Sequence, residues 1–94
     1  MRVTEKDCQY VSFYDFDFYE DICRLSINLE LWDKKPRVIE IPKTIRKNGK
    51  AYKVKEVSIS NGYYGDKHKV VVKSPKDVRF DYIHIDNYSI EYID

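Results

Sequence analysis

The chain has 94 residues, with 17 basic and 16 acidic side chains, so one domain spanning residues 1–94 with nearly balanced charge is expected. This balance argues against a wholly basic nucleic-acid-binding protein and against simple disorder. Val, Ile, Tyr and Phe dominate the apolar side chains, a composition typical of β-structure. No run approaches the roughly 18 apolar residues of a membrane helix, and the N-terminus has no apolar signal region. Neither a transmembrane segment nor a secretory signal is therefore expected, and the compartment stays open.

Two runs near the N-terminus alternate at the period of a β-strand and predict a β-hairpin over residues 10–21 and 23–32. In the first run, the aromatic residues that share a predicted face are Tyr14, Phe16 and Phe18. In the second run, the apolar face consists of Cys23, Leu25, Ile27, Leu29 and Leu31. Trp32 falls on the opposite, polar face of the second strand and is expected to be exposed.

The rest of the chain reads as short strands with no helix longer than one turn. Residues 37–41 form a strand that Pro42 ends, because proline cannot donate to a sheet ladder. Asn48-Gly49 predicts a tight hairpin turn. Residues 51–59 form the next strand, in which the apolar face shifts between Val54 and Val57 and indicates a bulge. Further strands are expected at residues 69–73, 82–86 and 89–93.

Two internal echoes suggest a repeated unit. Residues 38–45 resemble residues 70–78, since each is a β run followed by Pro-Lys, with the two prolines 33 positions apart. A second echo joins residues 54–60 with residues 88–94. Self-similarity at spacings of about 20–50 residues is typical of solenoid proteins.

The stretch IPKTIRKNGKAYKVKEVS, residues 41–58, carries a longer motif: Ile-Pro, an apolar residue, a turn with Asn-Gly-Lys, then Tyr-x-Val and another apolar residue. Its positions here are Ile41, Pro42, Ile45, Asn48, Gly49, Lys50, Tyr52, Val54 and Val57. A more degenerate continuation consists of Tyr64, Gly65, Val70 to Pro75, and Val78. Together these segments resemble the type-5 leucine-rich repeat domains of BspA-like bacterial surface proteins, over about residues 22–78 and more faintly to residue 94.

The resemblance implies an all-β, or nearly all-β, domain. It would have an N-terminal β-hairpin cap at about residues 10–33, followed at about residues 36–94 by one or two degenerate repeats in a short solenoid-like sheet. It also implies protein–protein or adhesive binding without catalysis, in a family that is usually exported to the cell surface. Stacked repeats usually need three or more copies to bury a continuous core, so self-association is expected to cover the open sheet edges.

A basic segment, residues 34–55, contains nine Lys and Arg side chains against one acid, Glu40, and follows an acidic N-terminal third. One interpretation is a phosphate-binding surface with Tyr52 as a stacking platform. The favoured alternative is a solvated strand–turn–strand that opposes the acidic segment, within the chain or in a second copy, because Lys on an edge strand also blocks unwanted pairing.

Other candidate sites carry weaker patterns. Cys8 and Cys23 could close a loop of about 16 residues as a disulfide, but a buried Cys23 and a free Cys8 are favoured. Three aspartates, Asp15, Asp17 and Asp21, lack the glycine and terminal Glu of a calcium loop. His84 and Asp86 share a strand face, but no nucleophile stands at an interpretable spacing. No enzyme activity, metal or cofactor is therefore expected.

The sequence thus predicts a non-enzymatic interaction module, self-associating as a homodimer, with protein as its partner and no membrane insertion. The candidate interaction surface combines exposed aromatic and basic residues: Trp32, Lys43, Arg46, Lys47, Lys50, Tyr52, Lys53, Tyr63 and Tyr64. The alternatives are a carbohydrate-binding module that uses exposed Tyr and Trp, and a small nucleic-acid binder that uses residues 34–55.

Overall fold

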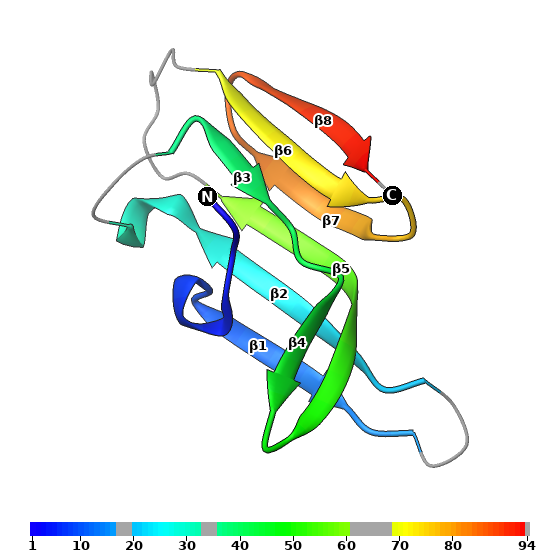
Figure 1. Ribbon diagram of the computed structural model, residues 1–94. Coiled ribbons are helices and arrows are strands. Elements are labelled where there is room, and N and C mark those ends of the chain that lie inside the picture. Colours follow the sequence, from blue (N-terminus) through cyan, green and yellow to red (C-terminus); the bar gives the residue numbers. More distant parts are fainter. Residues whose placement is uncertain (17–19, 33–35, 61–68, 94) are drawn as a thin grey trace.

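The computed structural model describes residues 1–16, 20–32, 36–60 and 69–93, and its regular elements there are β-strands and two short 3₁₀ helices (Figure 1). The strands are β1 (Tyr10–Tyr14), β2 (Ile22–Asn28), β3 (Val38–Glu40), β4 (Thr44–Lys47), β5 (Lys50–Ser60), β6 (Val70–Pro75), β7 (Arg79–His84) and β8 (Tyr88–Ile93). The 3₁₀ helices are η1 (Glu5–Asp7) and η2 (Leu29–Leu31). The predicted all-β class is confirmed. No described helix is long and apolar enough to cross a membrane.

The strands form two sheets, and the chain passes from one to the other. The larger sheet has the order β1-β2-β5-β4, with β7 also paired to β5, and the smaller sheet has the order β3-β6-β8. Strands β2, β5 and β7 are parallel to one another, as are β3, β6 and β8, whereas β1 and β4 pair antiparallel. Successive parallel strands of each sheet are therefore contributed by successive passes of the chain (Figure 1).

The first internal echo corresponds to neighbouring strands. Val38 pairs with Val71 and Ile39 with Val72, so β3 and β6 align at the same 33-residue offset that separates Pro42 from Pro75. The second echo does not correspond to paired strands, because residues 54–60 lie in the larger sheet and β8 lies in the smaller one. The two similar sequence patterns of the second echo thus lie in different sheets.

The predicted N-terminal hairpin is confirmed as β1 and β2. The aromatic face predicted for its first strand, however, is not the face that packs against the core. Phe13 is opposite Cys23, so Phe13 and Val11 are the residues of β1 that pack against the core. Tyr14 and Phe16 are 39% and 43% exposed, and Phe18 lies outside the described residues. The partner strand, which the pattern of β1 alone does not reveal, determines this face.

The Asn48-Gly49 turn and the bulge in β5 are both confirmed. Asn48 and Gly49 have φ values of +52° and +77°, a left-handed conformation that Asn and Gly adopt readily, and they join β4 to β5. In the pairing of β2 with β5, Cys23 is opposite Val54 but Arg24 is opposite Glu56, so Lys55 is the extra residue. This residue keeps both Val54 and Val57 in the core.

The N-terminal end of the core is covered by the first nine residues. The Met1 amino group donates to the Val38 carbonyl at 2.9 Å, and the Val3 backbone N–H donates to the Glu40 carbonyl at 2.9 Å. These contacts place residues 1–3 against the outer edge of β3. Val3 is buried, and Cys8 packs against the same core cluster.

Both cysteines are free thiols, as favoured from the sequence. Cys23 is buried in β2 and Cys8 is half-buried. Burial raises the pKa of the Cys8 thiol to about 12, with a further contribution from the Asp7 carboxylate, and raises the pKa of Cys23 to about 11.

These raised pKa values predict that both cysteine thiols react slowly with thiol reagents in the native protein. The thiolate is the reactive form, so at pH 8 we expect both cysteines to react slowly with Ellman's reagent until the chain is unfolded in urea. Absorbance at the released thionitrobenzoate band measures this. Rapid reaction of either thiol without denaturant would contradict the observed burial.

Candidate functional site

The predicted interaction surface does not form one patch. Lys43, Arg46, Lys47 and Lys50 are exposed, Lys53 and Trp32 are half-buried, and Tyr52 is buried. Tyr63 and Tyr64 lie outside the described residues.

Tyr52 is a core residue, and its predicted role as an exposed stacking platform is wrong. It is only 7% exposed, and its ring packs against that of Phe13 with centroids 4.7 Å apart. Its hydroxyl donates to Asp15 Oδ1 at 2.6 Å, which raises the pKa of Tyr52. Hydrogen bonds from Lys50 and Tyr52 hold the pKa of Asp15 below its usual value. A ring in this position cannot stack on a base or a sugar.

Trp32 is also not the exposed aromatic that the alternating pattern predicts. Strand β2 ends at Asn28, whose side chain accepts a hydrogen bond from the Glu30 backbone N–H at the start of η2. The 3₁₀ turn rotates the following residues, so Trp32 packs against the core and its Nε1–H donates to the Asp7 carbonyl at 2.7 Å. Trp32 thereby holds η1 in place.

The basic segment faces acidic side chains of the same chain. Lys50 Nζ lies 2.8 Å from Asp15 Oδ1 and 3.4 Å from Asp21 Oδ1. Lys53 Nζ lies 2.5 Å from Asp77 Oδ2, and the hydrogen bond with Asp77 raises the pKa of Lys53. The favoured interpretation, a strand–turn–strand that opposes the acidic N-terminal segment within the chain, is confirmed for Lys50, whereas Asp77, the partner of Lys53, lies in the C-terminal part of the chain.

The other basic candidates lie around the β4–β5 hairpin. Lys47 Nζ is 3.7 Å from Glu5 Oε1 and 4.6 Å from the centre of the Phe13 ring. Arg46 Nη2 donates to the Gly49 carbonyl at 3.4 Å. Lys43 lines a cleft of about 530 Å³ together with Lys53, among others. These mixed charges do not form the continuous positive track that a phosphate backbone requires.

The calcium and histidine patterns do not assemble a site in the part of the chain that the structure describes. Asp15 is engaged by Lys50 and Tyr52, and Asp17 lies outside the described residues. No group of three potential metal ligands gathers among the described side chains. His84 is exposed, and its ring lies against Tyr82 with centroids 4.9 Å apart.

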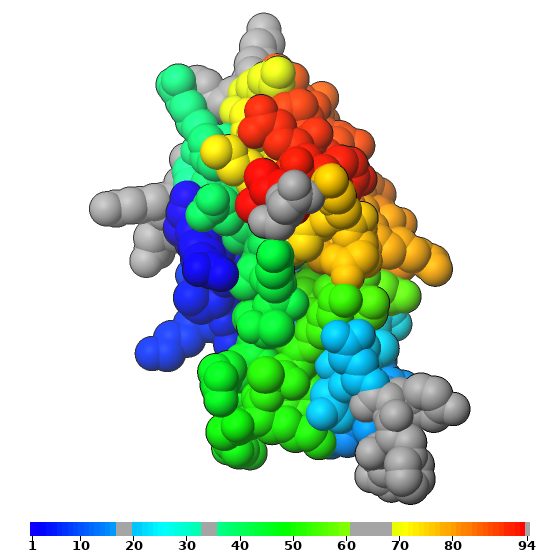
Figure 2. All heavy atoms as spheres, turned by 45° about the vertical axis from the view of Figure 1, so that its right-hand side comes forward, coloured from blue at the N-terminus to red at the C-terminus, as the bar shows by residue number. Residues whose placement is uncertain are grey.

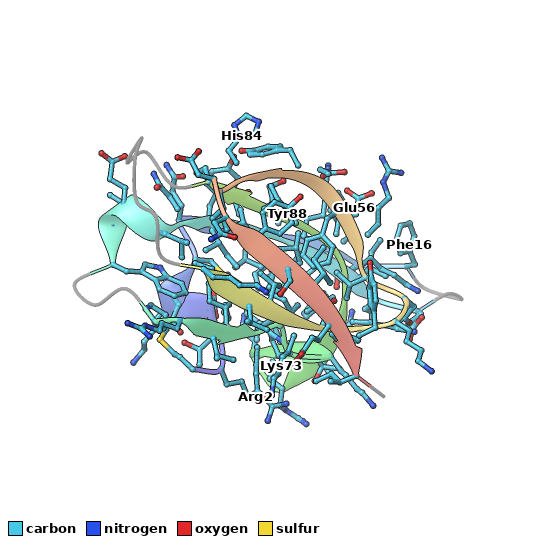
Figure 3. All side chains as sticks on the ribbon, turned by 90° about the horizontal axis from the view of Figure 1, so that it is seen from above. Arg2, Phe16, Glu56, Lys73, His84 and Tyr88 are labelled. Carbon is cyan, nitrogen blue, oxygen red and sulfur yellow. The ribbon has the colours of Figure 1, made fainter. Side chains whose placement is uncertain are left out.

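The C-terminal end of the molecule is built differently from the covered N-terminal end. Strands β7 and β8 are the last strands of their sheets in the described part of the chain. Phe80, Ile83 and Ile90 pack against the core but are only half-buried. Figure 3 looks onto this end and places Tyr88 between the ribbons of β7 and β8, with His84 projecting from the outer side of β7.

Large apolar side chains are exposed along β8. Tyr88, Tyr92 and Ile93 are 41%, 54% and 37% exposed, and the atoms of β8 form part of the surface in Figure 2. The pairing with β6 puts Ile90 opposite the buried Val72, and Tyr88 opposite Val70. Tyr88, Ile90 and Tyr92 therefore project from the core-facing side of β8. The sequence showed these tyrosines but not that they lie on the last strand of a sheet.

No family model, curated protein or solved structure matches this chain.

Proposed function

We propose that this protein is a non-enzymatic interaction module that self-associates through its C-terminal end. The observation that carries the proposal is the contrast between the two ends of the core. At one end residues 1–3 pair with β3, and Cys8 and Trp32 pack against the core, although β1 is an edge strand there. At the other end β7 and β8 leave half-buried apolar residues and have, among the described residues, no second partner strand. Exposed edges of this kind are ready templates for pairing with another chain.

A short solenoid-like array of degenerate repeats accounts for this asymmetry. In this interpretation the hairpin and the first residues form the cap. The segments β3–β5, β6–β7 and β8 that follow are degenerate repeats. The 33-residue alignment of β3 with β6, each followed or ended by a proline, supports it. Repeat arrays need a capping element at each end, and a second copy can cover the end that β7 and β8 form.

The covered N-terminal end favours a closed dimer over an open filament. Head-to-tail association through the smaller sheet would have to displace residues 1–3 from the outer edge of β3, whereas a two-fold axis brings two open ends together. Antiparallel pairing of β8 with its copy puts residues of the same face opposite each other. Ile90 would then lie at the axis, with Tyr88 opposite Tyr92 of the partner subunit.

The mass in solution tests this proposal. By size-exclusion chromatography with light scattering, we expect twice the monomer mass for the wild type and the monomer mass for the double variant Tyr88→Lys, Tyr92→Lys. Both tyrosines are already exposed, so the charges block pairing while the core stays intact. Leu31→Lys is the matched control, because Leu31 is 63% exposed at the covered end.

Two outcomes overturn the proposal. A wild type that stays monomeric at every concentration would exclude self-association, and a dimer that survives the double variant but not Leu31→Lys would place the interface at the other end. Repeating the measurement at high salt separates the sheet-edge dimer from one held by acidic and basic segments. We expect the sheet-edge dimer to persist, because apolar contacts are not screened by salt.

A further inference from the structure

The outer face of the larger sheet carries a trough between two exposed tyrosines. Tyr10 on β1 is 61% exposed and Tyr82 on β7 is 48% exposed. The trough has a volume of about 230 Å³, and its lining includes both tyrosines and the serines Ser12, Ser26 and Ser58. It lies on the opposite side of the sheet from the core.

The strand register places both tyrosines in a single row across four strands. Tyr10 is opposite Ser26 on β2, Ser26 is opposite Ser58 on β5, and Ser58 is opposite Tyr82 on β7. Neighbouring strands are about 4.8 Å apart, so the two tyrosines start roughly 14 Å apart at the backbone. The small serines between them leave the floor low and line it with hydroxyl groups.

The charged groups at one end of the trough form ion pairs with one another. Arg24 Nε lies 2.5 Å from Glu56 Oε2, and Arg24 Nη2 lies 2.6 Å from Asp81 Oδ2. This triad joins β2, β5 and β7, and Arg24 keeps the pKa of Asp81 below its usual value. A guanidinium engaged by two carboxylates offers no net attraction to an anion, which argues against a phosphate or sulfate ligand.

Two aromatic rings and a neutral hydroxyl-lined floor define the chemistry of a ligand. Tyrosine rings give apolar contact area with a polar end, and polar groups on the floor fix the orientation of what lies between them. A purely apolar ligand would leave the serine hydroxyls of the floor without polar contacts to it. A neutral sugar combines the apolar ring faces and the hydroxyl groups that this surface can satisfy.

We propose that the trough between Tyr10 and Tyr82 binds a short neutral oligosaccharide. The two tyrosine rings pack on sugar faces, and Ser26, Ser58 and Arg24 hydrogen-bond sugar hydroxyl groups. The site is independent of the proposed dimer. Tyr82 is on the outer face of β7, whereas the dimer uses the strand edges and the core-facing side of β8.

Calorimetric titration with defined sugars tests the site. The probes are cellohexaose, maltohexaose, laminarihexaose and N-acetylchitohexaose, with a heparin hexasaccharide as the anionic comparison. We expect at least one neutral probe to bind with an affinity that is insensitive to salt. Tyr10→Ala and Tyr82→Ala should each weaken that binding about tenfold, and Ser58→Leu should abolish it by filling the floor.

The control is Leu31→Ala, which removes an exposed apolar side chain outside the trough and the proposed dimer surface and should leave sugar binding unchanged. Circular dichroism confirms that each variant is folded, and light scattering reports the dimer separately. The proposal is overturned if none of the neutral probes binds at millimolar concentration. It is also overturned if heparin binds best and is released by salt, or if Leu31→Ala weakens sugar binding as much as the two tyrosine variants.

Discussion

Deletion of Lys55 is expected to leave a folded protein, whereas deletion of Ser58, three positions later in β5, is expected to be strongly destabilising. Lys55 is the extra residue opposite β2, since Cys23 pairs with Val54 and Arg24 with Glu56. Without it, Glu56 follows Val54 directly and regular alternation continues to Val57 and Ile59. Every core side chain of the strand keeps its face.

Deletion of Ser58 has the opposite effect because side chains alternate faces along a strand. Val57 and Ile59 are both fully buried, and without Ser58 between them they cannot share a face. Exposing one of them costs about 2–5 kcal/mol, a large part of the stability of a domain of this size. Urea denaturation followed by circular dichroism measures both deletions, and equal destabilisation would show that Lys55 is not the bulged residue.

A second large effect is expected from two leucines that the sequence pattern treats alike. Leu25 is 1% exposed at the centre of β2, whereas Leu31 is 63% exposed in η2. Leu25→Ala should lower the free energy of unfolding by about 2–5 kcal/mol, because it removes packed methyl groups and leaves a cavity. Leu31→Ala should change it by less than about 0.5 kcal/mol.

The leucine pair also tests where β2 ends. Equal losses for Leu25→Ala and Leu31→Ala would mean that the strand continues through residue 31, as the alternation from Cys23 predicts. In that case Trp32 would be exposed as well. Quenching of Trp32 fluorescence by acrylamide gives an independent measurement, and the packing of Trp32 against the core predicts weak quenching in the native state.

The sequence by itself determined the features that depend on short stretches of chain. These include the all-β class, the left-handed Asn48-Gly49 turn, the bulge between Val54 and Val57, and the offset of the two prolines. Each follows from local sterics or from the two-residue period of a strand. The pairing of basic with acidic segments could also be predicted from the sequence, because each segment contains a long block of like charges.

Only the tertiary structure decided which strands are neighbours, and the remaining features follow from that. The burial of Tyr52 depends on Phe13 and Asp15, and the position of Trp32 depends on η1. The row from Tyr10 to Tyr82 and the open end at β8 exist because parallel strands far apart in the sequence align side by side. Parallel strands are not joined by a tight turn that a sequence pattern could reveal, so no local pattern in β7 or β8 identifies its partner strand.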